Sequence, residues 1–390
     1  MIGLFAFTLC ASSLLAAEPN KKAWLENWYK QNPQWRALHF MRAPKPEDLP
    51  KFEKLIAESL VPAGINVLIL GITYDFQYQS HPELKCTGMN KKQARELVET
   101  CHKSGIRLIP LFECLGHQSM DRGLLKGYPD FDQPLDIAPG DKHSYSHEWC
   151  PSNPNVNKIV CDLFDELIDA FHADALHVGM DEVFMIGSKN CPKCHGKNVA
   201  ELFAGVVNPL HDHLVKEKGV EMLMWGDRLL KSPEYGSRNA ASTAGTHPAI
   251  DMVPKDIIMC DWHYPMQDDY PSVRFFEEKG FRVLPATWHY RNAALAFIRC
   301  SHRDATDRML GFLFTYWARD CNGLLEALKT EDTNQSNYAD DKPGPNPRVT
   351  SRQYANVIQA GLKEIAHPSE APKPSPTKNK PTKEPTTDGI

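Results

Sequence analysis

The sequence predicts an α/β protein built as a single (β/α)8 TIM barrel. Eight short apolar runs are spaced along the chain, helix-like stretches separate several of them, and no interior linker rich in Pro, Gly or Ser divides the body. Most of the runs are continuously apolar rather than alternating, which is typical of parallel strands buried on both faces. Eight βα units favour a closed barrel, with a doubly wound open sheet as the alternative.

The eight expected strands share short length and a high content of apolar residues. They are residues 37–41, 66–70, 108–112, 175–178, 222–225, 257–261, 282–286 and 311–316. Runs of this length bounded by polar residues favour strands over helices.

Helices are expected between the strands, and glycines mark where several of them end. The stretches 91–104, 200–218 and 270–279 precede Gly105, Gly219 and Gly280, and glycine readily adopts the left-handed conformation that ends a helix. The amphipathic stretch 155–172 follows Asn153-Pro154, a typical start signal.

Both ends of the chain differ from the body. Residues 1–17 hold no charged side chain and end in Ala16-Ala17, which predicts a secretory signal peptide and an exported, secreted or periplasmic protein. Residues 367–390 hold six prolines and four lysines, and such a segment buries too little apolar surface to offset its ordering entropy. We therefore expect a disordered tail there and a barrel over residues 18–366.

The charge of the body excludes one class of partner. The tail holds four lysines against three acidic residues, so the rest of the chain is slightly more negative than the net −5 of the whole. This excludes a generally basic nucleic-acid-binding protein. No segment of the body is long and apolar enough to predict a membrane span.

Aromatic residues gather where the expected strands end. Four of the eight tryptophans follow strands, namely Trp225, Trp262, Trp288 and Trp317. In a barrel of this class the active site lies at the C-terminal ends of the strands. Tryptophans interleaved with carboxylates favour a sugar site, where aromatic faces stack on pyranose rings. The alternative is that these tryptophans only cap the barrel core.

An acidic pair, Asp181-Glu182, follows the fourth expected strand and Gly179. Two carboxyl groups forced together have pKa values that differ, so that one can serve as acid and the other as base. Glycoside hydrolysis needs such a pair. Asp165-Glu166 is also an acidic pair, but it lies within an amphipathic stretch, where a solvated face explains it.

The motif His177-x-Gly179-x-Asp181-Glu182 resembles the signature of glycoside hydrolase family 20, the β-N-acetylhexosaminidases. The single-barrel layout looks like the short branch similar to hexosaminidase D. Ile109-Pro110, Glu113 and Gly116-His117 resemble the family's I-P-x-x-D-x-x-G-H, with Glu113 in place of the usual Asp. The likeness extends over roughly residues 35–317.

This resemblance implies a mechanism without a cofactor. Glu182 would protonate the leaving glycosidic oxygen and later activate water. Asp181 would orient the substrate's 2-acetamido group, whose oxygen attacks the anomeric carbon, so that a β-linked N-acetylhexosaminide is hydrolysed with retention.

The same resemblance and the strand-end positions predict further substrate-binding residues. They are Arg36, Glu113, His117, His177, Trp225, Asp227, Trp262, Tyr290 and Trp317. Tyr290 is expected to donate a hydrogen bond to the acetamido carbonyl group. His177 is as readily explained as a core histidine.

Two departures leave the substrate open. Met41 stands where the family has an aspartate. After Trp317, Arg319 stands where the family's Trp-x-Glu motif has its glutamate. These positions would contact outer sugar hydroxyls, so the choice among GlcNAc, GalNAc and a modified hexosamine stays open. A non-catalytic carbohydrate-binding barrel is the alternative function.

Eleven cysteines are many for this chain, and two belong to Cys191-Pro192-Lys193-Cys194-His195. This segment follows the acidic pair and matches the c-type haem attachment motif, but a short disulfide loop or a non-haem metal clip explains it better. An even number of cysteines after removal of the signal peptide is compatible with disulfides in an exported protein.

Overall fold

The computed structural model describes residues 23–118, 123–134, 147–330 and 350–371. Eight parallel strands close a barrel in chain order, with β1 paired to both β2 and β8. The strands are β1 Trp35–Phe40, β2 Val67–Gly71, β3 Arg107–Cys114, β4 Ala175–Gly179, β5 Glu221–Trp225, β6 Ile258–Trp262, β7 Arg282–Thr287 and β8 Gly311–Tyr316. The (β/α)8 prediction is confirmed, and each expected strand overlaps an observed one.

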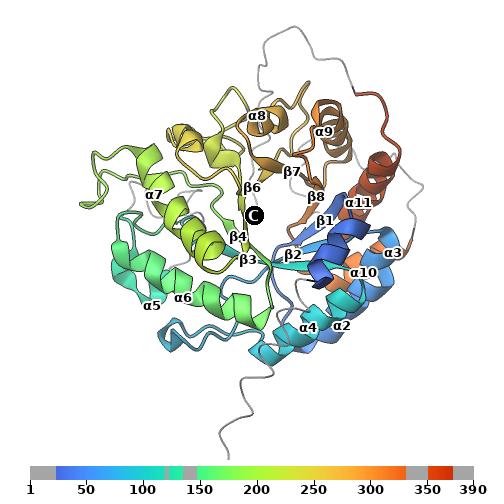
Figure 1. Ribbon diagram of the computed structural model, residues 1–390, viewed down its shortest axis with the longest axis horizontal. Coiled ribbons are helices and arrows are strands. Elements are labelled where there is room, and N and C mark those ends of the chain that lie inside the picture. The colour runs from blue at the N-terminus through green and yellow to red at the C-terminus, as the bar shows by residue number, and fades with distance from the viewer. Residues whose placement is uncertain (1–22, 119–122, 135–146, 331–349, 372–390) are drawn as a thin grey trace, which may run out of the picture.

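Helices form a layer around the strands (Figure 1). The α-helices are α2 Leu49–Leu55, α3 Val61–Ala63, α4 Lys91–Lys103, α5 Leu124–Gly127, α6 Pro154–Ala170, α7 Val199–His211, α8 Ser272–Glu278, α9 Arg291–Asp304, α10 Cys321–Lys329 and α11 Ser351–Ala366. The 3-10 helices are η1 Pro46–Asp48, η3 Pro82–Leu84, η4 Pro129–Phe131, η7 Asp227–Leu229 and η8 His247–Asp251; the π-helices are η2 Ile56–Leu60 and η6 Asp212–Glu217.

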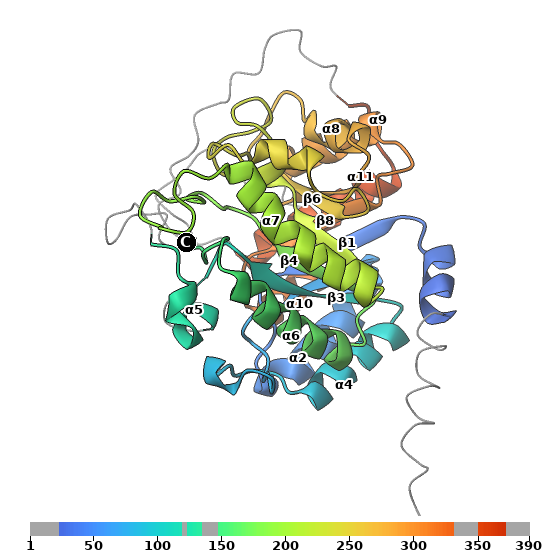
Figure 2. The ribbon, with the colours of Figure 1, turned by 60° about the vertical axis from the view of Figure 1, so that its left-hand side comes forward.

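The expected helices are all present, with shifted ends. Figure 2 shows α6 and α7 running side by side along the outside of the barrel. Asn153 caps α6 by accepting a hydrogen bond from the backbone N–H of Asn155, and Pro154 is the first helical residue. Asn90 and Gln93 form a capping box at the start of α4, an arrangement that stabilises a helix by about 1 kcal/mol.

Alternate residues of each strand face the barrel interior, because successive side chains point to opposite faces of a sheet. The interior positions form one apolar cluster that includes Ala37, Val67, Ile69, Ile109, Leu111, Ala175, Leu223, Ile258, Leu284 and Leu313. The intervening positions pack against the helices in a second, larger cluster. Both faces are apolar, which explains why the strands are continuously apolar in sequence.

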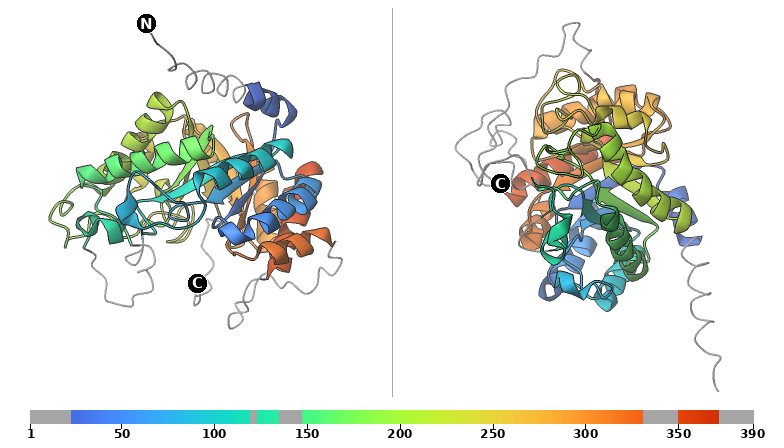
Figure 3. Two further views of the ribbon diagram at one scale, coloured as in Figure 1. Left: turned by 90° about the horizontal axis from the view of Figure 1, so that it is seen from below. Right: turned by 90° about the vertical axis from the view of Figure 1, so that its left-hand side faces the viewer.

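A helix over residues 23–31 lies at the N-terminal end of the barrel and is seen at the top of the left view in Figure 3. Its Trp28 is buried and donates a hydrogen bond from Nε1 to the carbonyl oxygen of Gly105 at 2.9 Å. The guanidinium of Arg107 lies 5.8 Å from the Trp28 ring and pairs with Asp174 and Glu221. Indole and guanidinium together close this end of the barrel.

The signal peptide predicted over residues 1–17 lies outside the described residues, as does most of the predicted tail, residues 372–390. Within the described ranges, none of the helices combines the length and the apolar character that crossing a bilayer requires.

Candidate active site

The acidic pair lies in a tight turn directly after β4. Gly179 has a φ of +66°, and Met180 and Glu182 also adopt positive φ values, +77° and +51°. Residues other than glycine rarely adopt this backbone conformation, which costs on the order of 1 kcal/mol of conformational strain for each of them. A side-chain carbon at position 179 would collide with the Glu113 carboxyl group, so glycine is required there. The turn places Asp181 and Glu182 at the C-terminal end of the barrel.

His117 joins the two acids. Its Nε2 atom lies 3.3 Å from Asp181 Oδ2 and 3.5 Å from Glu182 Oε2. Burial alone would lower the pKa of His117, but the charge of Asp181 and a hydrogen bond with that carboxylate, with a further contribution from Glu182, outweigh burial and raise this pKa to about 10. His117 is therefore a cation at neutral pH, shared between two carboxyl groups. The side chains of His117 and Glu182 are 25% and 15% exposed, which leaves both within reach of a ligand.

Glu113 supports Asp181 from inside the barrel. Burial, and then the nearby charge of Asp181, raises the pKa of Glu113 well above its usual range, so Glu113 keeps its proton. Burial alone would also raise the pKa of Asp181, but the charge of His117 and hydrogen bonds that include one with Glu113 hold it below its usual value. Asp181 is thus the anion and Glu113 the neutral acid.

Asp227, after β5, fixes the backbone of Glu182. Its Oδ2 atom accepts hydrogen bonds from the Glu182 backbone N–H at 3.0 Å and from Arg228 Nε at 2.6 Å. Asp227 and Arg228 are both fully buried. Burial raises the pKa of Asp227, and the charge of Arg228 opposes this rise.

Aromatic rings lie beside the acids. The rings of Trp225 and Trp317 have centroids 6.2 Å apart, and the His39 ring lies 5.5 Å from Trp225 and 4.6 Å from Trp317. Burial lowers the pKa of His39 to about 3, so its imidazole is neutral. His39 faces the interior of β1 and was not among the predicted site residues.

Tyr264 is a second residue that the sequence prediction missed. Its hydroxyl oxygen accepts a hydrogen bond from Trp317 Nε1 at 3.0 Å, and its ring packs on Trp262 at 4.8 Å. Burial raises the pKa of Tyr264; hydrogen bonds with Thr315 and Trp317 oppose this rise, and the charges of Asp181 and Glu182 add to it. Continuing the inward alternation of β6 from Cys260 and Trp262 to residue 264 would have identified it.

One predicted position, Arg36, is wrong, and the role predicted for Tyr290 has a second candidate. Arg36 lies near the N-terminal start of β1, between the inward-facing Trp35 and Ala37, and its Nε donates to the carbonyl oxygen of Gly64 at 2.5 Å. It therefore points outward at the end of the barrel opposite the acids. Tyr290 forms the N-cap residue of α9 and packs on Trp288 and His289, whereas Tyr264 contacts the predicted site residues Trp262 and Trp317 directly.

The other predicted residues divide by burial. Trp262 and Trp317 retain some exposure at the site, as do Glu182 and His117. His177, Trp225 and Asp227 are almost completely buried, so they support the site and are not available for direct sugar contact. His177 accepts a hydrogen bond through Nδ1 from the Gly179 backbone N–H at 3.0 Å, and burial lowers its pKa to about 3. This matches the core-histidine alternative.

A cavity of about 780 Å³ opens beside the ends of β1, β2 and β8. Arg42 and Asp75 form an ion pair on its wall, and Arg319 also lines it. Tyr74, another lining residue, donates to the side chain of Gln118, which follows His117. The lining includes the departure Arg319 but neither Asp181 nor Glu182, so this cavity is distinct from the space beside the acids.

Two groups of side chains in the described ranges have the spacing of metal ligands. One is His117, Asp181 and Glu182; the acids raise the pKa of His117, so a metal bound there would have to displace the proton of the imidazole. The other is Cys150, Cys191 and Cys194, two of which lie in the loop that follows the acids.

Comparison with known proteins gives one family and several related folds. The family described as "Glycosyl hydrolase family 20, catalytic domain" matches residues 73–290, more than half of the chain. A beta-hexosaminidase of Akkermansia muciniphila is 31% identical over 110 residues, which are 27% of this chain and 21% of that protein. The chain thus matches only about a fifth of the length of this curated relative.

Solved structures share the fold at low identity. A family 20 exo-β-N-acetylglucosaminidase of Vibrio harveyi, in complex with N-acetylglucosamine, has a TM-score of 0.59 and 14% identity over 86% of this chain and 55% of that one. A β-N-acetylhexosaminidase of Bacteroides fragilis has a TM-score of 0.58 and 14% identity over 88% of this chain and 67% of that one. Together with the family match and the geometry of Asp181 and Glu182, they lead to one conclusion: the chain belongs to glycosyl hydrolase family 20.

Proposed function

We propose that the protein is an exported, retaining β-N-acetylhexosaminidase that uses the 2-acetamido group of its substrate as the nucleophile. The observation that carries this proposal is the different support given to the two adjacent acids. Glu113 and His117 keep Asp181 anionic, whereas Glu182 is partly exposed and held by its backbone. The resemblance to a curated beta-hexosaminidase also supports it.

In the first step the acetamido oxygen attacks the anomeric carbon, and the bond to the leaving oxygen breaks. Glu182 gives its proton to that oxygen, so the aglycone departs as an alcohol. The positive charge of His117, 3.5 Å from Glu182 Oε2, stabilises the carboxylate that remains.

Asp181 acts on the other partner of this step. Attack by the carbonyl oxygen leaves positive charge on the acetamido nitrogen, and the Asp181 anion stabilises that charge while orienting the N–H. The proton kept by Glu113 matters here, because it lets Glu113 form a hydrogen bond with Asp181 that favours the anionic form of Asp181.

Tyr264 takes the role first expected of Tyr290. Its hydroxyl oxygen accepts from Trp317 Nε1, so its own proton is available to the acetamido carbonyl oxygen. Because the pKa of Tyr264 is raised, the phenol keeps this proton at neutral pH. Trp262 and Trp317 supply aromatic faces for the pyranose ring.

In the second step water attacks the anomeric carbon of the oxazolinium intermediate and Glu182 accepts the proton of that water. The acetamido group is regenerated and two displacements give net retention. The departures at Met41 and Arg319 leave the hexosamine unspecified, and they motivate the alternative of a barrel that binds carbohydrate without turnover.

The test is release of 4-nitrophenol from its β-GlcNAc and β-GalNAc glycosides by the wild type, by Glu182→Gln and by the exposed control Glu278→Gln. We expect activity in the wild type and control and a loss of at least about 100-fold in Glu182→Gln. NMR of the first-formed sugar should show the β-anomer. Binding of N-acetyl sugars without release of 4-nitrophenol by the wild type would instead support the binding barrel.

Export is tested separately. A reporter enzyme that is active only outside the cytoplasm should become active when residues 1–17 are fused to its N-terminus. N-terminal sequencing of the mature protein should show that those residues have been removed. Retention of residues 1–17 in the mature protein would contradict this part of the proposal.

A further inference from the structure

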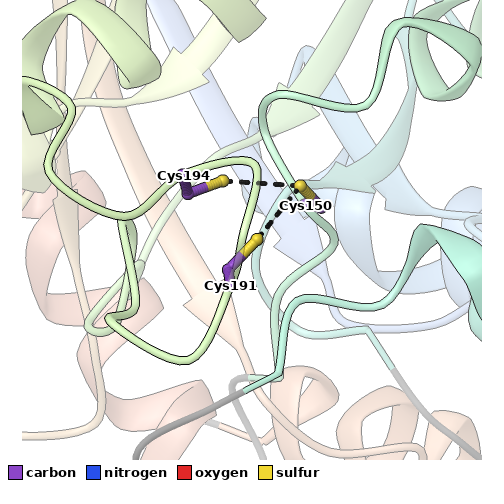
Figure 4. Close-up of side chains that lie close together, drawn as sticks. All are labelled: Cys150, Cys191 and Cys194. Carbon is purple, nitrogen blue, oxygen red and sulfur yellow. Dashed lines mark hydrogen bonds between the residues drawn. The ribbon is translucent and has the colours of Figure 1, made fainter.

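Three cysteines from two segments meet beside the catalytic barrel. Cys150 lies just before α6, and Cys191 and Cys194 lie in the loop between β4 and α7. The Cys150 sulfur is 3.5 Å from that of Cys191 and 3.4 Å from that of Cys194, and all three side chains are buried (Figure 4). Figure 4 shows the three sulfurs turned toward one another.

The spacing favours a shared ion over a disulfide. A disulfide needs sulfurs about 2.05 Å apart and joins only two of the three, which would leave a third buried thiol against the bond. Thiolates bound to a tetrahedral zinc ion at about 2.3 Å lie about 3.8 Å from one another. The two distances to the Cys150 sulfur are much closer to the second geometry, and all three sulfurs lie within 4.8 Å of one another.

Tight turns hold the loop that carries two of the sulfurs. The backbone N–H groups of Cys194 and His195 both donate to the Cys191 carbonyl oxygen, at 3.1 and 2.9 Å, and that of Cys191 donates to the Ser188 carbonyl oxygen at 3.0 Å. Cys191 and Cys194 are therefore held on one short turn that faces Cys150.

The type of ligand selects the metal. Three cysteine sulfurs without a carboxylate form a soft donor set, which suits Zn²⁺ and disfavours Ca²⁺ and Mg²⁺. Lys197 reaches across the two segments and donates to the Ser152 hydroxyl at 3.1 Å, which brings a positive charge near three potential thiolates. The sulfurs face Cys150 in a buried cluster, which also argues against covalent attachment of a haem through Cys191 and Cys194.

We propose that Cys150, Cys191 and Cys194 bind one Zn²⁺ ion as thiolates and that this ion clips the loop after β4 to the segment before α6. Binding releases the thiol protons. Among the described residues, the group of ligand-type side chains consists of these three, which leaves the fourth position of the tetrahedron open to a water molecule or another ligand. The proposal does not depend on the proposed hydrolase activity.

The ion would add to hydrogen bonds that already join the loop after β4 to the chain that precedes α6. Glu148 accepts a hydrogen bond from the Met185 backbone N–H at 2.8 Å, and Gln133 bonds to the backbone of Met185 and Gly187. The loop that begins with the acidic pair is thus fixed near its start by carboxylate and amide groups. A metal at Cys191 and Cys194 would fix its far end.

The first experiment measures metal content in the full chain, purified under reducing conditions without chelator. Elemental analysis should find about one zinc per chain in the wild type. Cys150→Ser, Cys191→Ser and Cys194→Ser should each lose most of it. Cys161→Ser, a half-buried cysteine on α6 outside the cluster, is the matched control and should keep it.

A second measurement uses the wild type and therefore does not depend on whether the variants fold. Cobalt added to the metal-free reduced protein should give thiolate-to-cobalt charge-transfer absorption that zinc abolishes. Alkylation followed by peptide mass spectrometry should find the three cysteines protected with zinc and modified after chelation. A disulfide joining any two of them in the native protein would overturn the proposal, as would a reduced wild type that takes up no zinc or cobalt.

Discussion

The backbone N–H of Glu182 donates a 3.0 Å hydrogen bond to the Oδ2 atom of Asp227, which lies on the neighbouring βα connection. The same oxygen accepts from Arg228 Nε, so a buried ion pair holds the acceptor in place. Glu182 sits at a φ of +51°, a conformation that must be enforced from outside the residue. The position of the proposed general acid therefore depends on a residue that a substrate does not touch.

Replacing Asp227 by Asn should reduce kcat more than it raises KM. The amide can still accept from Glu182, but it leaves Arg228 as a buried charge without its partner and allows the turn to shift. Misplacement of a catalytic group by about 1 Å can cost about 100-fold in rate. The measurement is steady-state kinetics on the 4-nitrophenyl glycoside, with the exposed Asp251→Asn as control. An unchanged kcat in Asp227→Asn would contradict the positioning role.

Replacing Tyr264 by Phe should lower kcat by about 100-fold, because removal of one preorganised donor to a developing charge has that effect. Tyr290→Phe is the matched control, since Tyr290 packs on Trp288 and His289 rather than at the acids. Equal losses in both variants, or a loss only in Tyr290→Phe, would restore the original assignment.

The stability of the protein should fall as the pH rises above neutral, and His117 should account for part of the fall. Its pKa is raised from about 6.5 in the unfolded chain to about 10 in the folded protein. The stabilisation is therefore complete below about pH 6.5 and is lost as the pH rises through about 10. Urea denaturation over this pH range should show that the difference in the free energy of unfolding between wild type and His117→Gln decreases as the pH rises. For the exposed control His195→Gln, this difference from the wild type should not change with pH.

Replacing Arg107 by Met should destabilise the fold without directly affecting the chemistry at the other end of the barrel. The change leaves Asp174 and Glu221 without their buried cation and should cost about 3 kcal/mol in the free energy of unfolding. Arg274→Met, at a half-exposed arginine, is the control and should change this free energy little. Activity at low temperature, measured alongside, should be retained by the folded fraction.

The strands were predictable because each is buried on both faces. Each strand contacts the helices on its outer face and the apolar cluster on its inner face, so polar and apolar residues do not alternate along it. Continuously apolar runs such as residues 311–316 are therefore easily recognised in the sequence. Asp181 and Glu182 were predictable because they follow such a strand within a specific motif. Helix 23–31 was not predicted, since its burial depends on contacts such as that of Trp28 with Gly105, far along the chain.

The error at Arg36 and the omission of Tyr264 have a common physical cause. Arg36 was assigned from the family resemblance, but the direction of a side chain is set by its parity within the strand. Arg36 lies between the inward-facing Trp35 and Ala37, whereas Tyr264 continues the inward series of Cys260 and Trp262. Cys150 was missed as a partner of Cys191 for another reason, because 41 residues separate them and only the folded loops bring them together.

The contact between Gly179 and Glu113 bears on how this sequence can change over time. The carboxyl group of Glu113 occupies the space that a side chain at position 179 would need. Shortening that acid would not free the position, because the Cα atom of residue 113 would still lie 2.9 Å from the added carbon and the φ of +66° favours glycine. Selection can therefore exchange one acid for another at position 113 only while glycine is kept at 179, so position 179 should be invariant among homologues even where position 113 varies.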